Sequence, residues 1–231
     1  MEECKKCNGL KWIVDRRTGK AIPCECQKVS KKEDFYLPPR FSKSCFENFQ
    51  TYKQAQLFQA KKTAEDFAKK FPAVDFGIIF IGPNGVGKTH LACAILNKIY
   101  KEKGIKGLFL DYSNLNFQLK DTFYGDEEES VNSLIEEFIE APLLVIDDLG
   151  SIKPSNWFLD IVYEIINQRY LKNKFMILTS AYQISEDTGK ENLYSRIGDA
   201  LVSRILEVCK IVEIQAKDHR KEVFQAGHKN K

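Results

Sequence analysis

Residues 76–100 read FGIIFIGPNGVGKTHLACAILNKIY and contain the clearest pattern in the chain. The continuous apolar run over 76–81 is typical of a buried strand in a parallel sheet. The segment that starts at Gly82 matches the pattern G-x4-G-K-T, and apolar residues at helical spacing follow it from Leu91 to Ile99. A strand, a glycine-rich loop and a helix in this order are the context in which the pattern forms a phosphate-binding loop.

The loop pattern assigns nucleotide-binding chemistry to its residues. Its glycines let the backbone curl so that successive N–H groups point at a phosphate, and the helix that follows adds the positive end of its dipole. Lys88 supplies a positive charge for the β and γ phosphates, and the Thr89 hydroxyl is a Mg²⁺ ligand. His90 is expected to pack under the loop. The predicted nucleotide-binding residues are Gly82, Pro83, Asn84, Gly85, Val86, Gly87, Lys88, Thr89 and His90.

A second apolar run ends in two carboxylates. Residues 143–146 read LLVI, and Asp147 and Asp148 follow directly. Ligands of open α/β sheets bind at the carboxyl ends of strands, so we expect Asp147 to support Mg²⁺, mainly through water. We expect Asp148 to orient or deprotonate the attacking water. Many ATPases of this kind have Glu there, and the shorter Asp predicts slow ATP hydrolysis.

Strands and helices alternate along the rest of the chain. Strands are expected at 105–111, 174–180 and 210–214, and helices at 114–125, 130–141, 156–171 and near 193–208. Ser113 is expected to cap the first of these helices. The alternation predicts an α/β fold in which a parallel five-stranded sheet lies between helices, of the ATPase rather than the small-GTPase type.

The N-terminal segment has its own pattern of cysteines. Four of the seven cysteines form C-x2-C, sixteen residues, then C-x-C. Four thiolates are a usual ligand set of a structural Zn²⁺ site. A short segment needs a bound metal ion for stability because it buries little apolar surface. Residues 10–22 between the pairs are expected to form a β-hairpin. The alternative is four reduced cysteines without metal. The predicted zinc ligands are Cys4, Cys7, Cys24 and Cys26.

Charge and composition divide the chain in the same way. The 231 residues hold 35 Lys and Arg and 32 Asp and Glu. Residues 1–71 alone hold 16 of these basic residues and nine of the acidic ones. This basic head suits a nucleic-acid or acidic-protein partner, or is simply a solvated lysine-rich face. No apolar run reaches about 18 residues, and no signal peptide is apparent, so we expect a cytoplasmic protein without a membrane partner. We expect a Cys-rich module with its linker over 1–44 and an ATPase domain over 45–231.

Taken together, the motifs resemble those of bacterial and phage replicative helicase loaders of the DnaC/DnaI type, which are AAA+ ATPases. The ATPase core is also similar to that of IstB-type transposition helpers. The resemblance covers nearly the whole chain and rests on CxxC…PCEC, LPPRFSKSCFENF, GPNGVGKTHLA, LLVIDDLG, ILTSAY, SRIGDALVSRI and AKDHR. The first two of these favour the loader branch. The resemblance implies ATP-dependent loading of the replicative DNA helicase onto single-stranded DNA at replication initiation, with ATP, Mg²⁺ and Zn²⁺ as cofactors. It also implies that the Cys-rich module within residues 1–44 binds the helicase.

The resemblance also implies roles for two arginines. Arg204 matches the arginine finger, which acts on the nucleotide bound by the next subunit and therefore requires self-association through the AAA+ domain. Arg196 competes with Arg204 for that role. Arg220 matches the sensor-2 arginine, and it would reach the nucleotide from a short tail because a full lid domain does not fit after it.

Lys120, Phe123 and Tyr124 fall on the helical insertion that loaders use to contact single-stranded DNA. Aromatic rings there would stack on bases while the lysine tracks the phosphates. The alternative is that the two aromatic residues belong to the core at helical spacing.

One position departs from the family pattern. Ala181 stands where the family usually has Asn as sensor 1. One of the neighbouring hydroxyl residues, Thr179 or Ser180, would then orient the water; the alternative is weak hydrolysis. Together with Asp148, this keeps open a nucleotide-gated DNA-binding adaptor that scarcely hydrolyses ATP. A second alternative is an IstB-like ATPase that assists a transposase.

Overall fold

The computed structural model describes residues 12–14, 21–23, 37–52, 54–123, 128–185 and 190–221. The chain divides into two units, Met1–Tyr36 and Leu37–Lys231, and each is described by itself. In the first unit, strand β1 (Trp12–Val14) pairs antiparallel with β2 (Ala21–Pro23), and Trp12 lies opposite Pro23. The hairpin predicted between the cysteine pairs is thus confirmed.

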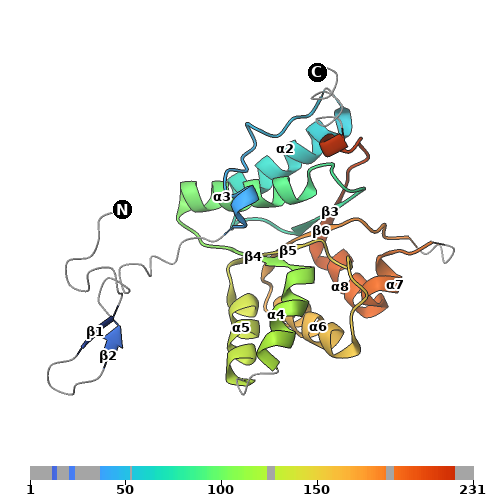
Figure 1. Cartoon of the computed structure of the whole chain (residues 1–231). Helices are drawn as coiled ribbons and strands as arrows, with labels where there is room; N and C mark the ends of the chain where they lie inside the picture. Colours follow the sequence, from blue (N-terminus) through green and yellow to red (C-terminus); the bar gives the residue numbers. More distant parts are fainter. Residues whose placement is uncertain are drawn as a thin grey trace, which may run out of the picture. The chain divides into compact units, whose positions relative to one another are not determined.

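The second unit is built on a parallel sheet of five strands, as the sequence predicts (Figure 1). The order of the strands is β4-β5-β6-β3-β7. The strands are β3 (Gly77–Ile81), β4 (Leu108–Asp111), β5 (Leu143–Asp147), β6 (Phe175–Ser180) and β7 (Cys209–Glu213). Every residue of β3 and β5 is buried, which explains their continuous apolar sequences. Strand β6 lies between the two, so the glycine-rich loop and the two carboxylates follow strands that are not direct neighbours.

Helices cover both faces of this sheet. Figure 1 shows α2 and α3 on one face and α4, α5, α6 and α8 on the other. The helices are η1 (Pro39–Phe41), α2 (Ala55–Lys70), α3 (Lys88–Lys103), α4 (Tyr112–Phe123), α5 (Glu128–Glu140), α6 (Asn156–Leu171), α7 (Leu193–Ile197) and α8 (Asp199–Val208). Alternate residues of β3 show the layering, because Ile79 and Ile81 belong to the core cluster formed with α4, α6 and α8.

Two details of the helices correct the sequence-based expectations. The helix predicted over 193–208 is broken at Gly198, whose φ of 87° lies outside helical geometry, so α7 and α8 are separate helices. The cap of α4 is Asp111 rather than Ser113, because Asp111 Oδ1 accepts the N–H groups of Ser113 (2.9 Å) and Asn114 (3.0 Å).

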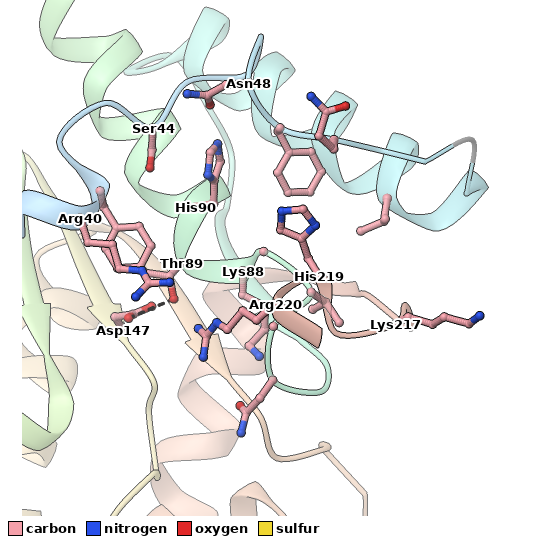
Figure 2. Close-up of a pocket in the computed structure, with 18 of the residues that line it drawn as sticks. Arg40, Ser44, Asn48, Lys88, Thr89, His90, Asp147, Lys217, His219 and Arg220 are labelled. Atoms are coloured by element: carbon pink, nitrogen blue, oxygen red, sulfur yellow. Dashed lines mark hydrogen bonds between the residues drawn. The ribbon is translucent and has the colours of Figure 1, made fainter. Parts of the chain in front are cut away.

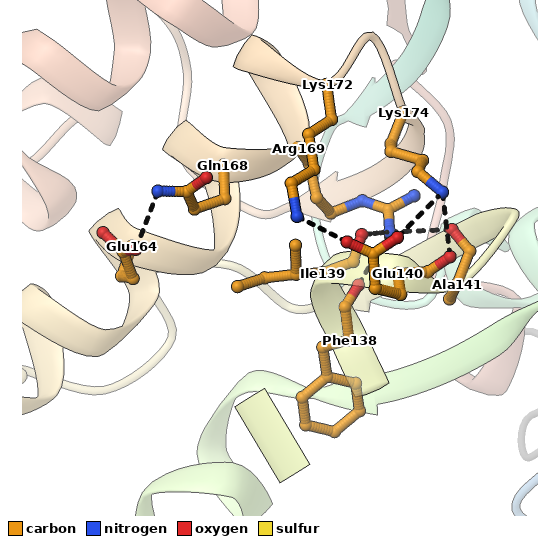
Figure 3. Close-up of polar contacts among 9 residues, drawn as sticks. All are labelled: Phe138, Ile139, Glu140, Ala141, Glu164, Gln168, Arg169, Lys172 and Lys174. Carbon is orange, nitrogen blue, oxygen red and sulfur yellow. Dashed lines mark hydrogen bonds and ion pairs between the residues drawn. The ribbon is translucent and has the colours of Figure 1, made fainter. Parts of the chain in front are cut away.

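A buried arginine of α6 joins the end of α5 to the start of β6, and Figure 3 shows its contacts with the end of α5. Arg169 of α6 is fully buried, and its Nη1 donates to the carbonyl oxygens of Phe138 (2.7 Å), Ile139 (3.0 Å) and Ala141 (2.9 Å), while Nη2 donates to Phe175 (2.5 Å). Burial lowers the pKa of Arg169 to about 10, so the group remains charged at neutral pH. The arginine thereby satisfies the last carbonyls of α5 and fixes α5 to the start of β6.

Candidate nucleotide-binding site

A cavity of about 610 Å³ opens at the carboxyl ends of the strands (Figure 2). This is the edge at which open α/β sheets bind ligands, and the volume is that of a typical small-molecule site. Its walls come from the lead-in over 40–57, the glycine-rich loop over 84–90 and the C-terminal segment over 217–220. Asp111, Asp147 and Asp148 form the floor at the ends of β4 and β5.

The loop can adopt its path only because of its glycines. Gly85 (φ 80°) and Gly87 (φ 97°) lie in the left-handed region, where side chains are strained. A Cβ atom at Gly85 would stand 1.8 Å from the Asp218 carboxylate, and one at Gly87 would stand 2.5 Å from the Phe49 ring. The lead-in and the C-terminal segment therefore both pack directly on the loop.

Lys88 is the first residue of α3, and its side chain is almost fully buried beside the loop. Its Nζ donates to the carbonyl oxygens of Gly82 (2.7 Å) and Pro83 (2.9 Å). Burial lowers the pKa of Lys88, and the nearby carboxylates of Asp148 and Asp147 oppose this. A cation at the N-terminus of a helix, beside a glycine-rich loop that lines a cavity, can bind the phosphates of a nucleotide.

Thr89 and Asp147 lie in contact, as the predicted magnesium site requires. Thr89 Oγ1 donates to Asp147 Oδ2 at 3.1 Å, and Thr179 Oγ1 donates to Asp147 Oδ1 at 2.7 Å. Burial raises the pKa of Asp147 to about 6, and the two threonine hydrogen bonds oppose that rise. In the part of the chain that the structure describes, no three His, Cys, Asp or Glu side chains form a metal site by themselves. A Mg²⁺ held here would therefore depend on the phosphates for most of its ligands, as is usual for this ion.

The hydroxyls of Thr179 and Ser180 are both used within the protein. Thr179 Oγ1 accepts the N–H group of Asp148 (2.8 Å) in addition to its bond to Asp147, and Ser180 Oγ donates to the carbonyl of Leu149 (2.8 Å). Both residues thus hold the segment after β5. Their side chains are buried and their protons are already donated, so neither can donate to a water in the sensor-1 role without breaking one of these contacts. Asp148 lines the cavity in a left-handed conformation, with φ 57°.

His90 and Asn97 attach the lead-in to α3. His90 Nε2 lies 3.0 Å from the carbonyl oxygen of Cys45, and its ring centre lies 5.5 Å from that of Phe49. Asn97 Nδ2 donates to the carbonyl of Ser44 at 2.8 Å. His90 also lines the cavity, but its contacts assign it to positioning the lead-in. The segment before residue 45, interpreted as a linker from its sequence, packs against α3.

The C-terminal segment closes the outer side of the cavity. The N–H group of His219 donates to the Gly85 carbonyl at 3.1 Å, and its Nδ1 lies 2.6 Å from the Tyr52 hydroxyl. Arg220 lines the cavity and lies near enough to Lys88 to contribute to the lowering of its pKa. This is the location that the sensor-2 prediction needs. The role of Tyr52 was not predicted, since nothing in the sequence links it to a residue 167 positions away.

Arg40 is a second residue that sequence analysis missed. Figure 2 shows Arg40 entering the cavity from the lead-in on the side of Thr89 and Asp147, whereas Arg220 enters from the opposite side. The only sequence signal was an arginine inside the PPRF segment. Five cationic side chains and three carboxylates line the cavity, so its excess positive charge is complementary to a triphosphate. The cations are Arg40, Lys43, Lys88, Lys217 and Arg220.

The two candidates for an arginine finger lie outside the cavity. Arg204 of α8 is half-buried and donates from Nε to Asn167 Oδ1 at 2.9 Å. Arg196 of α7 is buried and donates from Nε to the Gly150 carbonyl at 2.6 Å. Neither reaches the nucleotide site of its own chain.

The remaining predicted residues cannot be compared with the structure. Cys4, Cys7, Cys24, Cys26 and Tyr124, together with the side chains of Lys120 and Phe123, lie outside the described residues. Zinc ligation and DNA contact therefore remain predictions. Among the helices that are described, none is both long and apolar enough to span a membrane.

The sheet order, the loop and the Thr89–Asp147 pair define a P-loop nucleotide-binding protein of the AAA+ class. The chain belongs to the family of IstB-like ATP binding proteins, whose model matches residues 36–226.

Three relatives show the two branches of this similarity. The crystal structure of the DnaC helicase loader superimposes with a TM-score of 0.67 at 32% identity, covering 77% of this chain and 99% of that one. The replicative helicase loader DnaC of Escherichia coli is 30% identical over 58% of this chain and 53% of its own length. The insertion sequence IS5376 putative ATP-binding protein of Geobacillus stearothermophilus is 29% identical over 62% of this chain and 55% of its own. The chain thus spans about half the length of these two curated relatives.

Proposed function

We propose that this protein is an ATPase that loads a replicative DNA helicase onto single-stranded DNA. The observation that carries the proposal is the similarity to the crystal structure of the DnaC helicase loader, at 32% identity over 99% of that chain. The site supports the nucleotide part of the proposal, because a buried cation, a Thr–Asp pair and two further arginines surround one cavity.

The residues of the cavity divide the work of binding and hydrolysis. Lys88 and the loop amides would hold the β and γ phosphates, and Thr89 and Asp147 would hold Mg²⁺, which would neutralise phosphate charge. Asp148 stands beside this pair and orients the attacking water. Arg220 binds the phosphates from the C-terminal segment, which already packs on the loop through His219 and Asp218.

A transposase-assisting ATPase is the second candidate. It is supported by the family description and by the 29% identity to the IS5376 protein. The same cavity would serve both functions, so the partner protein distinguishes them. The adaptor alternative has support of its own, since Thr179 and Ser180 are held by other contacts in a site whose sensor-1 position is Ala181.

The direct test is size-exclusion chromatography of the full chain with the replicative helicase of the same genome, with and without Mg²⁺ and ATP. We expect a complex whose stability changes when ATP is added. In Lys88→Ala, adding ATP should leave the stability of the complex unchanged. Replacing Cys4 and Cys7 by Ser should weaken the complex if the N-terminal module binds the helicase. No complex under any condition, combined with a complex with the cognate transposase, would assign the protein to the transposition branch.

Hydrolysis is tested separately by ATP turnover with single-stranded DNA. The loader proposal expects turnover that falls at least tenfold in Asp148→Asn. Equal and negligible turnover in both proteins, with ATP binding intact, would support the adaptor instead.

A further inference from the structure

Three arginines on α6, α7 and α8 differ in what surrounds them. Arg169 is fully buried and donates to four backbone carbonyls. Arg196 is 7% exposed, donates to the Gly150 carbonyl and pairs with Glu191 at 3.5 Å. Both guanidinium groups are therefore used inside their own chain. Arg204 is half-buried, and no carboxylate of the described residues lies within ion-pair distance of it.

Arg204 is nevertheless held in one orientation by neutral groups. Its Nε donates to Asn167 Oδ1 at 2.9 Å, and its Nη1 donates to the carbonyl of Ala200 at 2.9 Å. The guanidinium carbon lies 5.0 Å from the ring centre of Tyr163 and 6.0 Å from that of Tyr170. Stacking on aromatic rings and hydrogen bonding to an amide fix an arginine without neutralising its charge.

The supporting residues are themselves arranged by two helices. Tyr163, Asn167 and Tyr170 are spaced by four and three along α6, so they lie on one face of that helix. The Tyr170 hydroxyl contacts both carboxylate oxygens of Glu207, at 3.0 and 3.1 Å. Glu207 lies one turn after Arg204 on α8, so the ring under the guanidinium is fixed from the same helix. We call Tyr163, Asn167 and Tyr170 the arginine cradle.

We propose that the arginine cradle positions Arg204 for the nucleotide site of a second copy of this chain. The proposal rests on the ATPase function proposed above and on the role of an arginine finger between subunits, which the resemblance implies for Arg204. The partner surface is the rim of the cavity that the second copy presents, and the ligand is the γ-phosphate bound there. Arg196 is excluded from this role because its charge is already paired and its guanidinium is bonded to the segment after β5.

The cradle has a mechanistic purpose. A long arginine side chain loses much rotamer freedom when it must reach one point in a transition state. A side chain that is already oriented loses less on assembly, and its contribution to the rate is correspondingly larger. The cradle residues are positioning residues, because they act through Arg204 and touch neither the nucleotide nor water in the site.

Mixed subunits give a test that a merely structural role would not affect. A chain with Arg204→Ala keeps its loop but lacks the finger, whereas a chain with Lys88→Ala keeps the finger but lacks a working loop. Each alone should be nearly inactive in ATP turnover with single-stranded DNA, and an equimolar mixture should regain activity. In the mixture, ATP binds to one chain and Arg204 comes from the other.

The cradle is then changed only on the chain that donates the arginine. Adding Asn167→Leu to the Lys88→Ala donor should lower kcat of the mixture about tenfold and leave KM for ATP unchanged. Gln168→Leu is the matched control, since Gln168 contacts Glu164 instead of Arg204 and should have no effect (Figure 3). Tyr163→Leu should also lower kcat, and Tyr163→Phe, which keeps the ring, should restore it.

The outcomes separate the cradle from the proposed function. If the donor with Asn167→Leu gives the mixture the same ATP turnover as the Gln168→Leu control, the proposal for the arginine cradle is wrong. It is also wrong if the mixture regains no activity while the wild type is active. Absence of ATP binding in the wild type overturns the proposed function itself. ATP binding without any turnover in the wild type overturns the cradle and supports the adaptor.

Discussion

Replacing Asp147 by Asn should make the nucleotide-free protein more stable at pH 8. Asp147 is only 8% exposed, and burial raises its pKa to about 6 from the ordinary 3.8. At about 1.4 kcal/mol per pKa unit, the gap corresponds to about 3 kcal/mol. The folded state binds the proton more tightly than the unfolded state, so this carboxyl stabilises the fold fully below about pH 3.8, loses that contribution as the pH rises toward 6, and contributes none of it at pH 8.

The asparagine variant removes this titration. Its amide can still accept the Thr179 hydroxyl, so the main hydrogen bond of the site is retained. We expect Asp147→Asn to exceed the wild type in free energy of unfolding by up to about 3 kcal/mol at pH 8 and by about half as much at pH 5. Urea unfolding followed by circular dichroism, in EDTA and without nucleotide, measures both values.

A matched control variant and the addition of ligand test whether the effect is specific to the Asp147 carboxylate. Asp160→Asn on the exposed face of α6 should change the unfolding free energy by less than about 0.5 kcal/mol at either pH. Adding Mg²⁺ and ATP should stabilise the wild type more than Asp147→Asn, because the carboxylate then has its ligand. If the variant is no more stable at pH 8, or if its advantage does not shrink toward pH 5, the reasoning about a desolvated Asp147 is wrong.

Three other expectations concern the walls and supports of the site. Arg40→Ala should weaken binding of a fluorescent ATP analogue about tenfold, since a charge-assisted contact is lost; unchanged affinity would remove Arg40 from the site. Gly85→Ala should lower Tm by at least about 3 °C and weaken ATP binding, whereas Gly104→Ala, also at positive φ but with open space around it, should affect Tm alone. Arg169→Met should cost at least about 3 kcal/mol in urea unfolding because four buried carbonyls lose their donor, and the exposed Lys172→Met should cost at most about 1 kcal/mol.

The sequence was most informative where local pattern and burial coincide. The helix predicted at 156–171 has those bounds in the structure, because its apolar stripe faces the core and Ser155 caps its start. The strand predicted at 76–81 differs by one residue. The break at Gly198 was missed because the apolar spacing continues across it from α7 into α8.

The site was predictable in its centre but not in its walls. The G-x4-G-K-T pattern and the strand-end carboxylate place Lys88, Thr89 and Asp147 together, since both strands end at the same edge of one sheet. Tyr52 is placed by its contact with His219 at the other end of the unit, and Arg40 reaches the cavity from the lead-in; no periodicity encodes either placement. The lead-in also carries no strong helical or strand pattern, so its attachment to α3 through side-chain bonds to backbone carbonyls emerges only in the fold.

Isothermal titration with Mg²⁺ and ATP tests the central claim most directly, namely that this cavity binds the nucleotide. We expect one ATP per chain, with an affinity at least tenfold lower in Lys88→Ala because a charged partner of the phosphates is removed. Binding should also be weaker when EDTA removes Mg²⁺, since Thr89 and Asp147 then have no ion to hold. Absence of binding by the wild type, or equal affinity in Lys88→Ala, would contradict the account.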